Sequence, residues 1–378
     1  MLKQILPGAT LGVLGSGQLG RMFAIEARRL GYNVHVFSPD EKTPTGAVAD
    51  REWSAAYDDF DALDQFAKSV DVVTLEFENV STAALERLEK QVPVRPGPQV
   101  LEAAQNRLKE KRAMASFGLP TAPFAAINDL KQLKEKLTEF GGKGILKTAS
   151  WGYDGKGQQT VNSEDDLATV WESYEGQETI LEGFVDFARE LSIIGIRDAN
   201  GNFDCFDPIL NVHANHILDV SLAGPELFSM NIIKRAKEII RTIMESLNAV
   251  GVLCVELFQT GSDELVVNEI APRPHNSGHL TIDAHYCCQF AQQVRAICNL
   301  PLGSTKLRQP AAMANLLGDV WSADGTPDWS QALSTPEIRL HLYGKDEAKP
   351  GRKMGHMTAL SSSCQEAEEI VRSVRDSL

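Results

Sequence analysis

Short apolar runs alternate with helix-forming segments over the first hundred residues of the chain. The strands predicted from this pattern are 11–14, 33–37 and 70–77, and the predicted helices are 18–30 and 81–90. Strands that alternate with helices in this way predict a doubly wound, Rossmann-like parallel α/β domain. The stretch 92–98 is rich in proline and breaks this alternation, which indicates a linker.

Beyond this linker, helices and strands follow one another in mixed order. The predicted helices are 99–117, 130–140, 231–247 and 281–298, and the predicted strands are 144–147, 179–184, 190–196, 203–208, 253–258 and 264–270. Pro301 and Gly303 then open a smaller region of short strands and turns. We therefore predict an α/β domain over 1–98, an α+β domain over 99–300 and a small β-rich C-terminal domain over 301–378.

The composition is that of an ordinary globular protein, with 43% hydrophobic and 23% charged residues over 378 positions. The net charge of −14 argues against a general binder of nucleic acid or of membrane surfaces. The sequence contains no run of eighteen apolar residues to span a membrane, and its start does not read as a signal peptide. Its six cysteines show no Cys-x-x-Cys spacing, so we expect reduced core thiols in a cytoplasmic protein.

Two glutamates occupy matching positions on the predicted strands 253–258 and 264–270. The turn residues between the strands predict a hairpin. If Thr260 pairs with Leu265, Glu256 lies directly opposite Glu269. Like charges at such positions repel one another, so we expect a cation between them, and hard oxygen ligands favour magnesium. The alternative is a solvated edge hairpin that carries two surface acids.

A glycine-rich turn follows the first strand. The segment 15–20 has the pattern G-x-G-x-x-G, and Asp40 follows the next strand, which together form a dinucleotide fingerprint. Glu76 and Glu78 end a strand of the same sheet, at the edge where α/β sheets bind ligands. One interpretation is an NAD-dependent dehydrogenase, and another is a tight turn that only lets the helix pack on the strand. Neither interpretation accounts for the remaining two thirds of the chain.

A second group of residues predicts a nucleotide site. Lys147 ends a strand and precedes the glycine-rich segment 151–158, whose backbone amides can close over phosphates. The strand 179–185 can meet an adenine edge, and Glu190 can accept from ribose hydroxyls. An ordinary glycine-rich hairpin is the alternative for the loop alone. Together with the paired glutamates, these features predict ATP and magnesium.

The segment 271–279 directly follows Glu269. Its Arg273 can stabilise a phosphoryl group or a small anion, and His275 and Asn276 can bond an oxyanion or handle a proton. A zinc site made of His275, His279 and His285 is an alternative, although no cysteine and no His-Glu-x-x-His helix accompanies these histidines.

Four longer segments carry a family resemblance, namely 15–22 (GSGQLGRM), 152–158 (GYDGKGQ), 268–279 (NEIAPRPHNSGH) and 350–356 (PGRKMGH). The hairpin, the lysine and the glycine loop resemble the ATP-grasp superfamily of carboxylate–amine ligases. The four segments resemble its 5-(carboxyamino)imidazole ribonucleotide synthetase family. This resemblance implies an ATP-grasp architecture behind a Rossmann-like domain. It also implies carboxylation of the exocyclic amine of 5-aminoimidazole ribonucleotide with ATP and bicarbonate, through carboxyphosphate, in de novo purine biosynthesis.

The same resemblance implies a role for each matching position. ATP would be bound by Arg107, Lys147, Gly152, Tyr153, Asp154, Gly155, Lys156, Gly157, Gln158, Glu182, Gly183, Phe184, Val185, Glu190, His213, Asn268 and Glu269. The ribonucleotide would be bound by Gly15, Gln18, Leu19, Glu76, Tyr153, Asp154, Lys345, Arg352 and Lys353. The catalytic set would be Asp154, Arg273, His275, Asn276 and Lys353.

The resemblance further implies that Glu256 and Glu269 hold Mg²⁺ and that the protein is a homodimer. The expected partners are small molecules, with neither nucleic acid nor membrane among them. Two other functions stay open on the sequence. A dehydrogenase would show a nicotinamide absorbance change without ATP, and a non-catalytic regulator would bind ADP without turnover.

Overall fold

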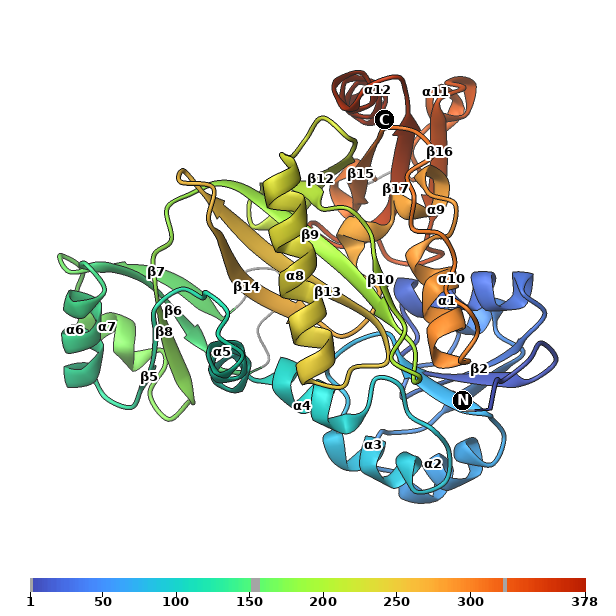
Figure 1. Ribbon diagram of the computed structural model, residues 1–378, viewed down its shortest axis with the longest axis horizontal. Coiled ribbons are helices and arrows are strands. Elements are labelled where there is room, and N and C mark those ends of the chain that lie inside the picture. The colour runs from blue at the N-terminus through green and yellow to red at the C-terminus, as the bar shows by residue number, and fades with distance from the viewer. Residues whose placement is uncertain (1–2, 151–156, 322–324) are drawn as a thin grey trace.

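The computed structural model describes residues 3–150, 157–321 and 325–378 (Figure 1). Its N-terminal sheet has four parallel strands within the described residues, in the order β3-β2-β1-β4. The elements are β1 (Thr10–Leu14), α1 (Gln18–Arg29), β2 (Asn33–Ser38), β3 (Arg51–Ser54), α2 (Phe60–Ala67), β4 (Val72–Leu75) and α3 (Thr82–Glu89). The predicted parallel α/β domain is confirmed. The sequence analysis missed α2 and β3, and β3 is a short, largely polar edge strand.

The predicted helix over 99–117 is wrong, because the structure divides it into α4 (Pro98–Gln105) and α5 (Arg107–Ser116). Asn106 separates them with an extended backbone, φ −131° and ψ 117°. Its side chain accepts from the Lys109 N–H and so caps α5. Its amide nitrogen also donates to Glu178 Oε2 at 2.6 Å. The break matters for the site because it brings Arg107 to the N-terminus of a new helix.

A small antiparallel sheet in the described part of the chain has the order β5-β8-β6-β7. Its strands are β5 (Phe124–Ile127), β6 (Lys143–Thr148), β7 (Gln158–Asn162) and β8 (Thr179–Gly183), and its helices are α6 (Leu130–Glu139) and α7 (Leu167–Glu172). Leu133 and Leu137 of α6 pack with Leu146 and Leu181 of the strands in one apolar cluster. This unit forms the lobe at the left of Figure 1. The sequence analysis did not identify β5, β7 and α7.

A larger sheet of nine strands, counted over the described residues, runs through the rest of the molecule in the order β14-β13-β9-β11-β12-β15-β17-β16, with β10 beside β9. Its strands are β9 (Phe187–Arg197), β10 (Phe203–Cys205), β11 (Ile209–Ala214), β12 (Ile217–Ala223), β13 (Gly251–Thr260), β14 (Leu265–Ala271), β15 (Ala311–Leu317), β16 (Ile338–Leu342) and β17 (Lys353–Leu360). Helix α8 (Met230–Ser246) crosses one face of β9, β13 and β14 (Figure 1). The C-terminal strands thus extend the central sheet, and the predicted domain boundaries near 98 and 300 stay a prediction.

The predicted helix over 281–298 is also wrong, since the structure contains α9 (Thr281–Ala284) and α10 (Gln289–Ile297). The intervening residues pair with another segment: His285 forms a β-bridge with Leu307, and the Tyr286 N–H donates to the Lys306 carbonyl at 3.2 Å. Helix α10 packs on α1 in one apolar cluster, which joins the N-terminal domain to the central one. The remaining helices are α11 (Ser330–Ser334) and α12 (Cys364–Asp376).

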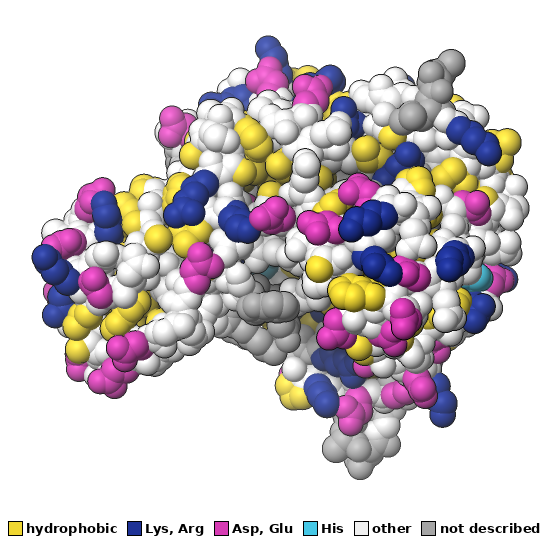
Figure 2. Space-filling view, turned by 90° about the horizontal axis from the view of Figure 1, so that it is seen from below, with side chains coloured by type: hydrophobic (Ala, Val, Ile, Leu, Met, Phe, Trp, Pro, Cys, Tyr) yellow, Lys and Arg dark blue, Asp and Glu magenta, His cyan; other side chains and the backbone are white. Residues whose placement is uncertain are grey.

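The surface and the cysteines agree with the expectations from composition. Basic and acidic side chains are interspersed over the face seen in Figure 2, as expected for a chain in which 23% of the residues are charged. All six cysteines are buried and free. Among the helices that the structure describes, none is long and apolar enough to cross a membrane.

Acid is expected to destabilise the fold in part through His285. Its ring is 5% exposed and packs edge-on against Phe206, with the ring centroids 5.1 Å apart. Burial lowers the pKa of His285 from 6.5 to about 4. A lowered histidine pKa stabilises the fold above pH 6.5, and this stabilisation is lost as the pH falls toward 4.

The substitution His285→Phe should therefore reduce the loss of unfolding free energy between pH 7 and pH 5 by about 2 kcal/mol. Urea denaturation at both pH values measures this difference. A variant with the same pH dependence as the wild type would contradict the assignment.

Candidate active site

The paired glutamates lie opposite each other on the central sheet, as predicted. Glu256 of β13 pairs with Glu269 of β14. The predicted pairing of Thr260 with Leu265 is wrong, because Leu265 pairs with Gln259. A register shift between Glu256 and Leu257 leaves one extra residue, Asn268, on β14 and restores the pairing of the acids. A β-bulge thus compensates for the different turn register.

The two acids repel each other and have separate partners. Burial, followed by the negative charge of Glu269, raises the pKa of Glu256 to about 7. Asn268 Nδ2 lies 3.5 Å from Glu256 Oε2, and His275 Nε2 lies 3.4 Å from Glu256 Oε1. On the other acid, Arg107 Nη1 lies 3.3 Å from Glu269 Oε2. The arrangement concentrates negative charge at one place, which a cation would stabilise.

Helix α5 holds the backbone on both sides of Glu269. Glu110 accepts from the N–H of Ile270, and Lys111 Nζ donates to the carbonyl of Asn268 at 2.6 Å. Both side chains are buried, and burial raises the pKa of Glu110 to about 8. The sequence analysis assigned no role to Glu110 or Lys111. The sequence did contain one signal for them. Asn106 is a typical helix N-cap residue, and it would have predicted a helix that begins at Arg107 and carries Glu110 and Lys111.

Replacing Lys111 is expected to destabilise the protein more than replacing its neighbour Lys109. Lys111 is 1% exposed and lies 3.8 Å from the buried Glu182 carboxylate. Lys111→Met leaves the Asn268 carbonyl without this donor and should lower the free energy of unfolding by about 3 kcal/mol.

Lys109→Met is the matched control, because Lys109 is exposed on the same helix and pairs with the exposed Glu102. It should cost less than about 1 kcal/mol. Urea denaturation measures both values, and equal losses in the two variants would contradict the prediction.

The predicted phosphate lysine and the acid of the adenine strand form one buried pair. Lys147 Nζ donates to Glu182 Oε2 at 2.9 Å, and both residues are nearly fully buried. Burial lowers the pKa of Lys147, against the opposing charge of Glu182. The charges of Lys111 and Lys147 outweigh burial and lower the pKa of Glu182. The Glu182 carboxylate therefore orients Lys147 in this structure.

The end of the predicted adenine strand is exposed. Phe184 is 43% exposed, and Lys143 Nζ lies 3.5 Å from the centroid of its ring. The Gly183 N–H donates to the Pro123 carbonyl at 2.7 Å. Val185 is half-buried. These contacts leave the Phe184 side chain at the surface, where an apolar ligand could pack on it.

His213, which the residues alone would not have singled out, lies against Glu190. Its Nδ1 contacts Glu190 Oε2 as an ion pair. Burial opposes charge on the ring, but the hydrogen bond and the charge of Glu190 outweigh it and raise the pKa of His213. The charge of Glu256 also acts on His213, which places this pair beside the acidic hairpin.

The segment after β14 carries three predicted residues, of which His275 contacts Glu256 of the acidic hairpin. Arg273 Nε lies 2.6 Å from Glu78 Oε1. Burial lowers the pKa of His275 well below its usual value, so the ring is neutral. Asn276 begins a 3₁₀ turn (Asn276–Gly278), and both polar atoms of its amide are buried without a hydrogen-bond partner. An unsatisfied buried amide of this kind is expected where a polar ligand binds.

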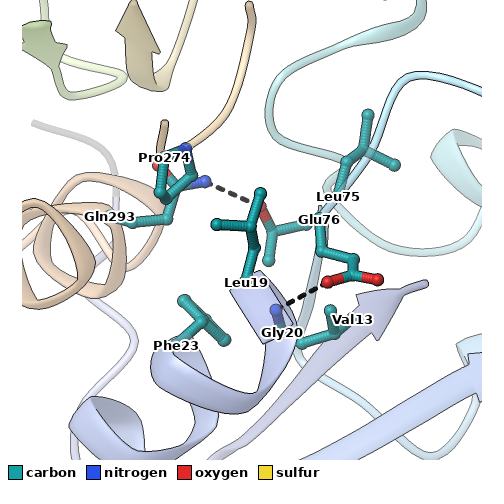
Figure 3. Close-up of a pocket in the computed structure, with 9 residues that line it drawn as sticks. Val13, Leu19, Gly20, Phe23, Leu75, Glu76, Pro274 and Gln293 are labelled. Atoms are coloured by element: carbon teal, nitrogen blue, oxygen red, sulfur yellow. Dashed lines mark hydrogen bonds between the residues drawn. The ribbon is translucent and has the colours of Figure 1, made fainter. Parts of the chain in front are cut away.

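The N-terminal glycine turn holds a carboxylate of the protein itself. Glu76 Oε2 accepts from the Gly20 N–H at 2.8 Å (Figure 3). The Gly17 N–H also donates to this carboxylate. Gly15 has φ +98°, and a Cβ there would lie 2.3 Å from Glu76 Cγ. Burial raises the pKa of Glu76 against these donors. The helix N-terminus that would bind a pyrophosphate in a dehydrogenase is thus occupied by Glu76.

This turn also meets the segment after β14. Leu19, Glu76, Pro274 and Gln293 line one small pocket (Figure 3). Gln293 Nε2 donates to Thr74 Oγ1 at 2.7 Å, which ties α10 to the N-terminal sheet. Gln18, the first residue of α1, is half-buried. The predicted substrate-binding turn and the predicted anion-binding segment therefore share one interface.

Of the three predicted basic residues near the C-terminus, Lys345 and Lys353 are in contact, whereas the Arg352 side chain is exposed. Lys345 Nζ donates to the Lys353 carbonyl at 2.7 Å. The charge of Lys353 acts on Glu256 and His275, so β17 reaches the acidic hairpin. Arg352 is exposed, and its Nη1 donates to the Glu347 carbonyl at 2.7 Å.

Several predicted residues lie outside the described part of the chain, namely Gly152, Tyr153, Asp154, Gly155 and Lys156. Gly157 follows with φ +70°, and its carbonyl accepts from the Thr148 N–H at 3.0 Å. Gln158 pairs with Lys147 across β6 and β7. Gln158 thus lies beside the buried lysine.

The zinc alternative gains no support from the histidines. His279 contacts Gln289 and His356, whereas His285 packs on Phe206. Over the ranges described, no group of three or more His, Cys, Asp or Glu side chains is arranged to hold a metal.

A lysine-bearing small sheet that faces an acidic hairpin on a larger sheet defines the ATP-grasp class of ATP-dependent ligases. Family models agree and divide the chain into three parts. They are a ribonucleotide synthetase preATP-grasp domain (residues 8–105), an ATP-grasp domain (residues 112–290) and a phosphoribosylaminoimidazole carboxylase C-terminal domain (residues 311–370).

Comparison with similar proteins narrows the ATP-grasp class to one family. The chain is 42% identical to N5-carboxyaminoimidazole ribonucleotide synthase of Bacillus subtilis, over 95% of this chain and 93% of the relative. It is 41% identical to the synthase of that name from Brucella melitensis, over 94% of this chain and 97% of the relative. The chain belongs to the N5-carboxyaminoimidazole ribonucleotide synthase family.

Solved structures agree with this family. The ADP complex of an N5-carboxyaminoimidazole ribonucleotide synthetase has a TM-score of 0.92 at 41% identity, covering 99% of this chain and 98% of that one. The Aspergillus clavatus synthase in complex with ADP and 5-aminoimidazole ribonucleotide has a TM-score of 0.88 at 31% identity, covering 98% and 99%. The predicted family, fold class and function as an ATP-dependent ligase of purine biosynthesis are confirmed.

Proposed function

We propose that the site described above converts ATP, bicarbonate and 5-aminoimidazole ribonucleotide into ADP, phosphate and N5-carboxyaminoimidazole ribonucleotide. One observation carries the assignment of this chemistry to the site. His275 Nε2 lies 3.4 Å from Glu256 Oε1, and Glu256 faces Glu269. This contact brings the proposed phosphate-binding hairpin and the proposed bicarbonate-binding segment together. The relative in complex with ADP and 5-aminoimidazole ribonucleotide supports the choice of substrates.

The acidic hairpin fits magnesium. Burial and the charge of the facing Glu269 raise the pKa of Glu256 to about 7, and the Asn268 amide lies beside Glu256. Divalent magnesium prefers such hard oxygen donors, so Glu256 and Glu269 would hold the ion. When bound, it would offset negative charge on the nucleotide phosphates.

Basic residues of two elements would bind the phosphates of ATP. Lys147 of β6 pairs with Glu182, and Arg107 of α5 pairs with Glu269 of the acidic hairpin. The loop from Gly152 to Gln158 would close over the phosphates, and the backbone of 182–185 would meet adenine. Glu190 would bind the ribose, with His213 orienting its carboxylate.

The reaction would proceed in three steps. A bicarbonate oxygen attacks the γ-phosphorus, the bond to ADP breaks, and carboxyphosphate forms. Arg273, His275 and Asn276 would bind bicarbonate or the carboxyphosphate. Breakdown of the carboxyphosphate releases carbon dioxide and phosphate. The exocyclic amine of the ribonucleotide then attacks the carbon, and Asp154 takes the amine proton.

The ribonucleotide would lie between the N-terminal turn and β17. The turn around Gly15, Gln18 and Leu19 and the carboxylate of Glu76 would form one wall, and Tyr153 and Asp154 would also contact the ribonucleotide. Lys345, Arg352 and Lys353 would meet its phosphate. Support comes from the charge of Lys345, which acts on Glu76.

The test is ADP release measured in bicarbonate buffer with and without 5-aminoimidazole ribonucleotide. We expect release that depends on both the ribonucleotide and bicarbonate, with one carboxylated product per ADP. Release that is independent of the ribonucleotide would reject the proposal.

Two further parts of the proposal concern assembly and location. We propose a homodimer in the cytoplasm. The family resemblance supports the dimer, and the six free, buried cysteines fit a reducing compartment. Light scattering after size-exclusion chromatography tests the dimer.

A further inference from the structure

The first residue of α10, Gln289, binds the peptide groups on both sides of His275. Gln289 Oε1 accepts from the His275 N–H at 2.8 Å, and Gln289 Nε2 donates to the His275 carbonyl at 2.7 Å. The side chain is 0% exposed. One amide group thus fixes both backbone polar atoms of His275, which lies 14 positions earlier in the chain.

A third contact fixes the orientation of this amide. Gln289 Nε2 lies 3.2 Å from Nδ1 of His279. Burial lowers the pKa of His279 well below its usual value, so the ring is neutral and its Nδ1 can accept. The approach is close: a Cβ at Gly278 would lie 2.6 Å from Gln289 Oε1. A glycine is therefore required at position 278 for this packing.

The two hydrogen bonds from Gln289 to the backbone of His275, here called the Gln289 clamp, position the His275 side chain at the centre of the site. His275 Nδ1 lies 2.9 Å from Ser277 Oγ, and Ser277 Oγ in turn accepts from Ser192 Oγ at 2.7 Å. The opposite nitrogen of His275 lies 3.4 Å from Glu256. The ring is therefore held by Ser277, while Gln289 holds the backbone from which the ring projects. A displacement of the backbone would move the ring away from the acidic hairpin.

We propose that Gln289 is a positioning residue for carboxyl transfer, which keeps His275 and the adjoining Asn276 in place during the lifetime of the reactive intermediate. This inference rests on the proposed function of the 273–276 segment. If the backbone is loosened, bicarbonate binds less well and the intermediate is lost to water before the amine attacks. ATP is then consumed without carboxylation. Displacements of about 1 Å are enough to reduce rates by about 100-fold.

The same helix provides a matched control. Gln292 is also 0% exposed and forms the same kind of clamp, with Nε2 donating to the Gly303 carbonyl at 2.7 Å and Oε1 accepting from the Gly303 N–H at 3.0 Å. Gly303 lies outside the proposed site. Gln292→Met therefore removes an equivalent pair of backbone bonds without loosening His275.

The experiment measures ADP and carboxylated ribonucleotide in parallel for the wild type, Gln289→Met and Gln292→Met. In Gln289→Met we expect at least about five ADP per carboxylated product and a KM for bicarbonate raised about tenfold, with the KM for ATP unchanged. Gln292→Met should lower the melting temperature similarly but keep one ADP per product. Gln289→Glu retains the acceptor for the His275 N–H and replaces Gln289→Met if that variant does not fold.

The inference would be overturned if the Gln289 variants released one ADP per carboxylated product and kept the wild-type KM for bicarbonate. It would also be overturned if Gln292→Met released as much excess ADP as Gln289→Met. A wild-type protein without ribonucleotide-dependent ADP release would instead overturn the proposed function, so the two failures are distinct.

Discussion

Glu269→Ala is expected to lower ATP turnover by at least about 100-fold, because the acidic hairpin would lose one of its two facing carboxylates. The fold should persist. The charge of Glu269 is one cause of the raised pKa of Glu256, so its removal relieves repulsion between the acids. Arg107 loses an ion-pair partner, although the charges of Glu110 and Glu182 also act on it. ADP release in bicarbonate buffer measures turnover, and a thermal melt reports the fold.

Glu264→Ala is the matched control for this substitution. Glu264 is exposed and precedes β14, away from the opposing acids. It should keep wild-type turnover. Normal activity in Glu269→Ala would remove the metal assignment, and equal losses in both variants would show a general effect on the hairpin.

Lys147→Met should lower turnover by about 100-fold or more and weaken ADP binding, since it removes one of the two cations proposed to bind the phosphates. It should also destabilise the protein by about 3 kcal/mol, because Glu182 is buried and Lys147 is its nearer partner at 2.9 Å. Lys111, 3.8 Å from the same carboxylate, would remain to pair with it. The pKa of Glu182 should rise as a result. Calorimetric titration with ADP and urea denaturation measure the two effects.

Lys131→Met serves as the control, because Lys131 is exposed on α6 of the same lobe. It should change the affinity for ADP by no more than about twofold and the free energy of unfolding by no more than about 0.5 kcal/mol. Full ADP affinity in Lys147→Met would exclude a phosphate role for this lysine and leave it a structural partner of Glu182.

The two helices that sequence analysis predicted as continuous show why local pattern is insufficient. Asn106 and the 285–288 segment each interrupt a stretch of helix-forming residues. Asn106 forms bonds with Ser150 and Glu178, which lie far away along the chain. Segment 285–288 pairs with residues near 306. Both breaks serve the site, because one places Arg107 at a helix start and the other makes Gln289 the first residue of α10.

The glycine-rich turn at 15–20 shows that local sequence pattern is also insufficient to predict function. Its pattern is compatible with a dinucleotide, and only the structure shows that the Glu76 carboxylate accepts from the turn's N–H groups. The acid lies more than fifty positions away from them in the chain. No local rule could have assigned it as the partner of this turn.

The sequence by itself determined the class of fold, the family and the identity of the paired acids, because alternating strands and helices, long motifs and strand periodicity are local properties of the chain. It even predicted Glu256 opposite Glu269, although through a turn register that a bulge at Asn268 then corrected. Tertiary structure alone decided which groups hold those residues: Glu110 and Lys111 beside Glu269, Glu182 on Lys147 and Gln289 around His275. These contacts join residues that are distant in the chain, and buried polar atoms find partners only once the folded core has excluded water.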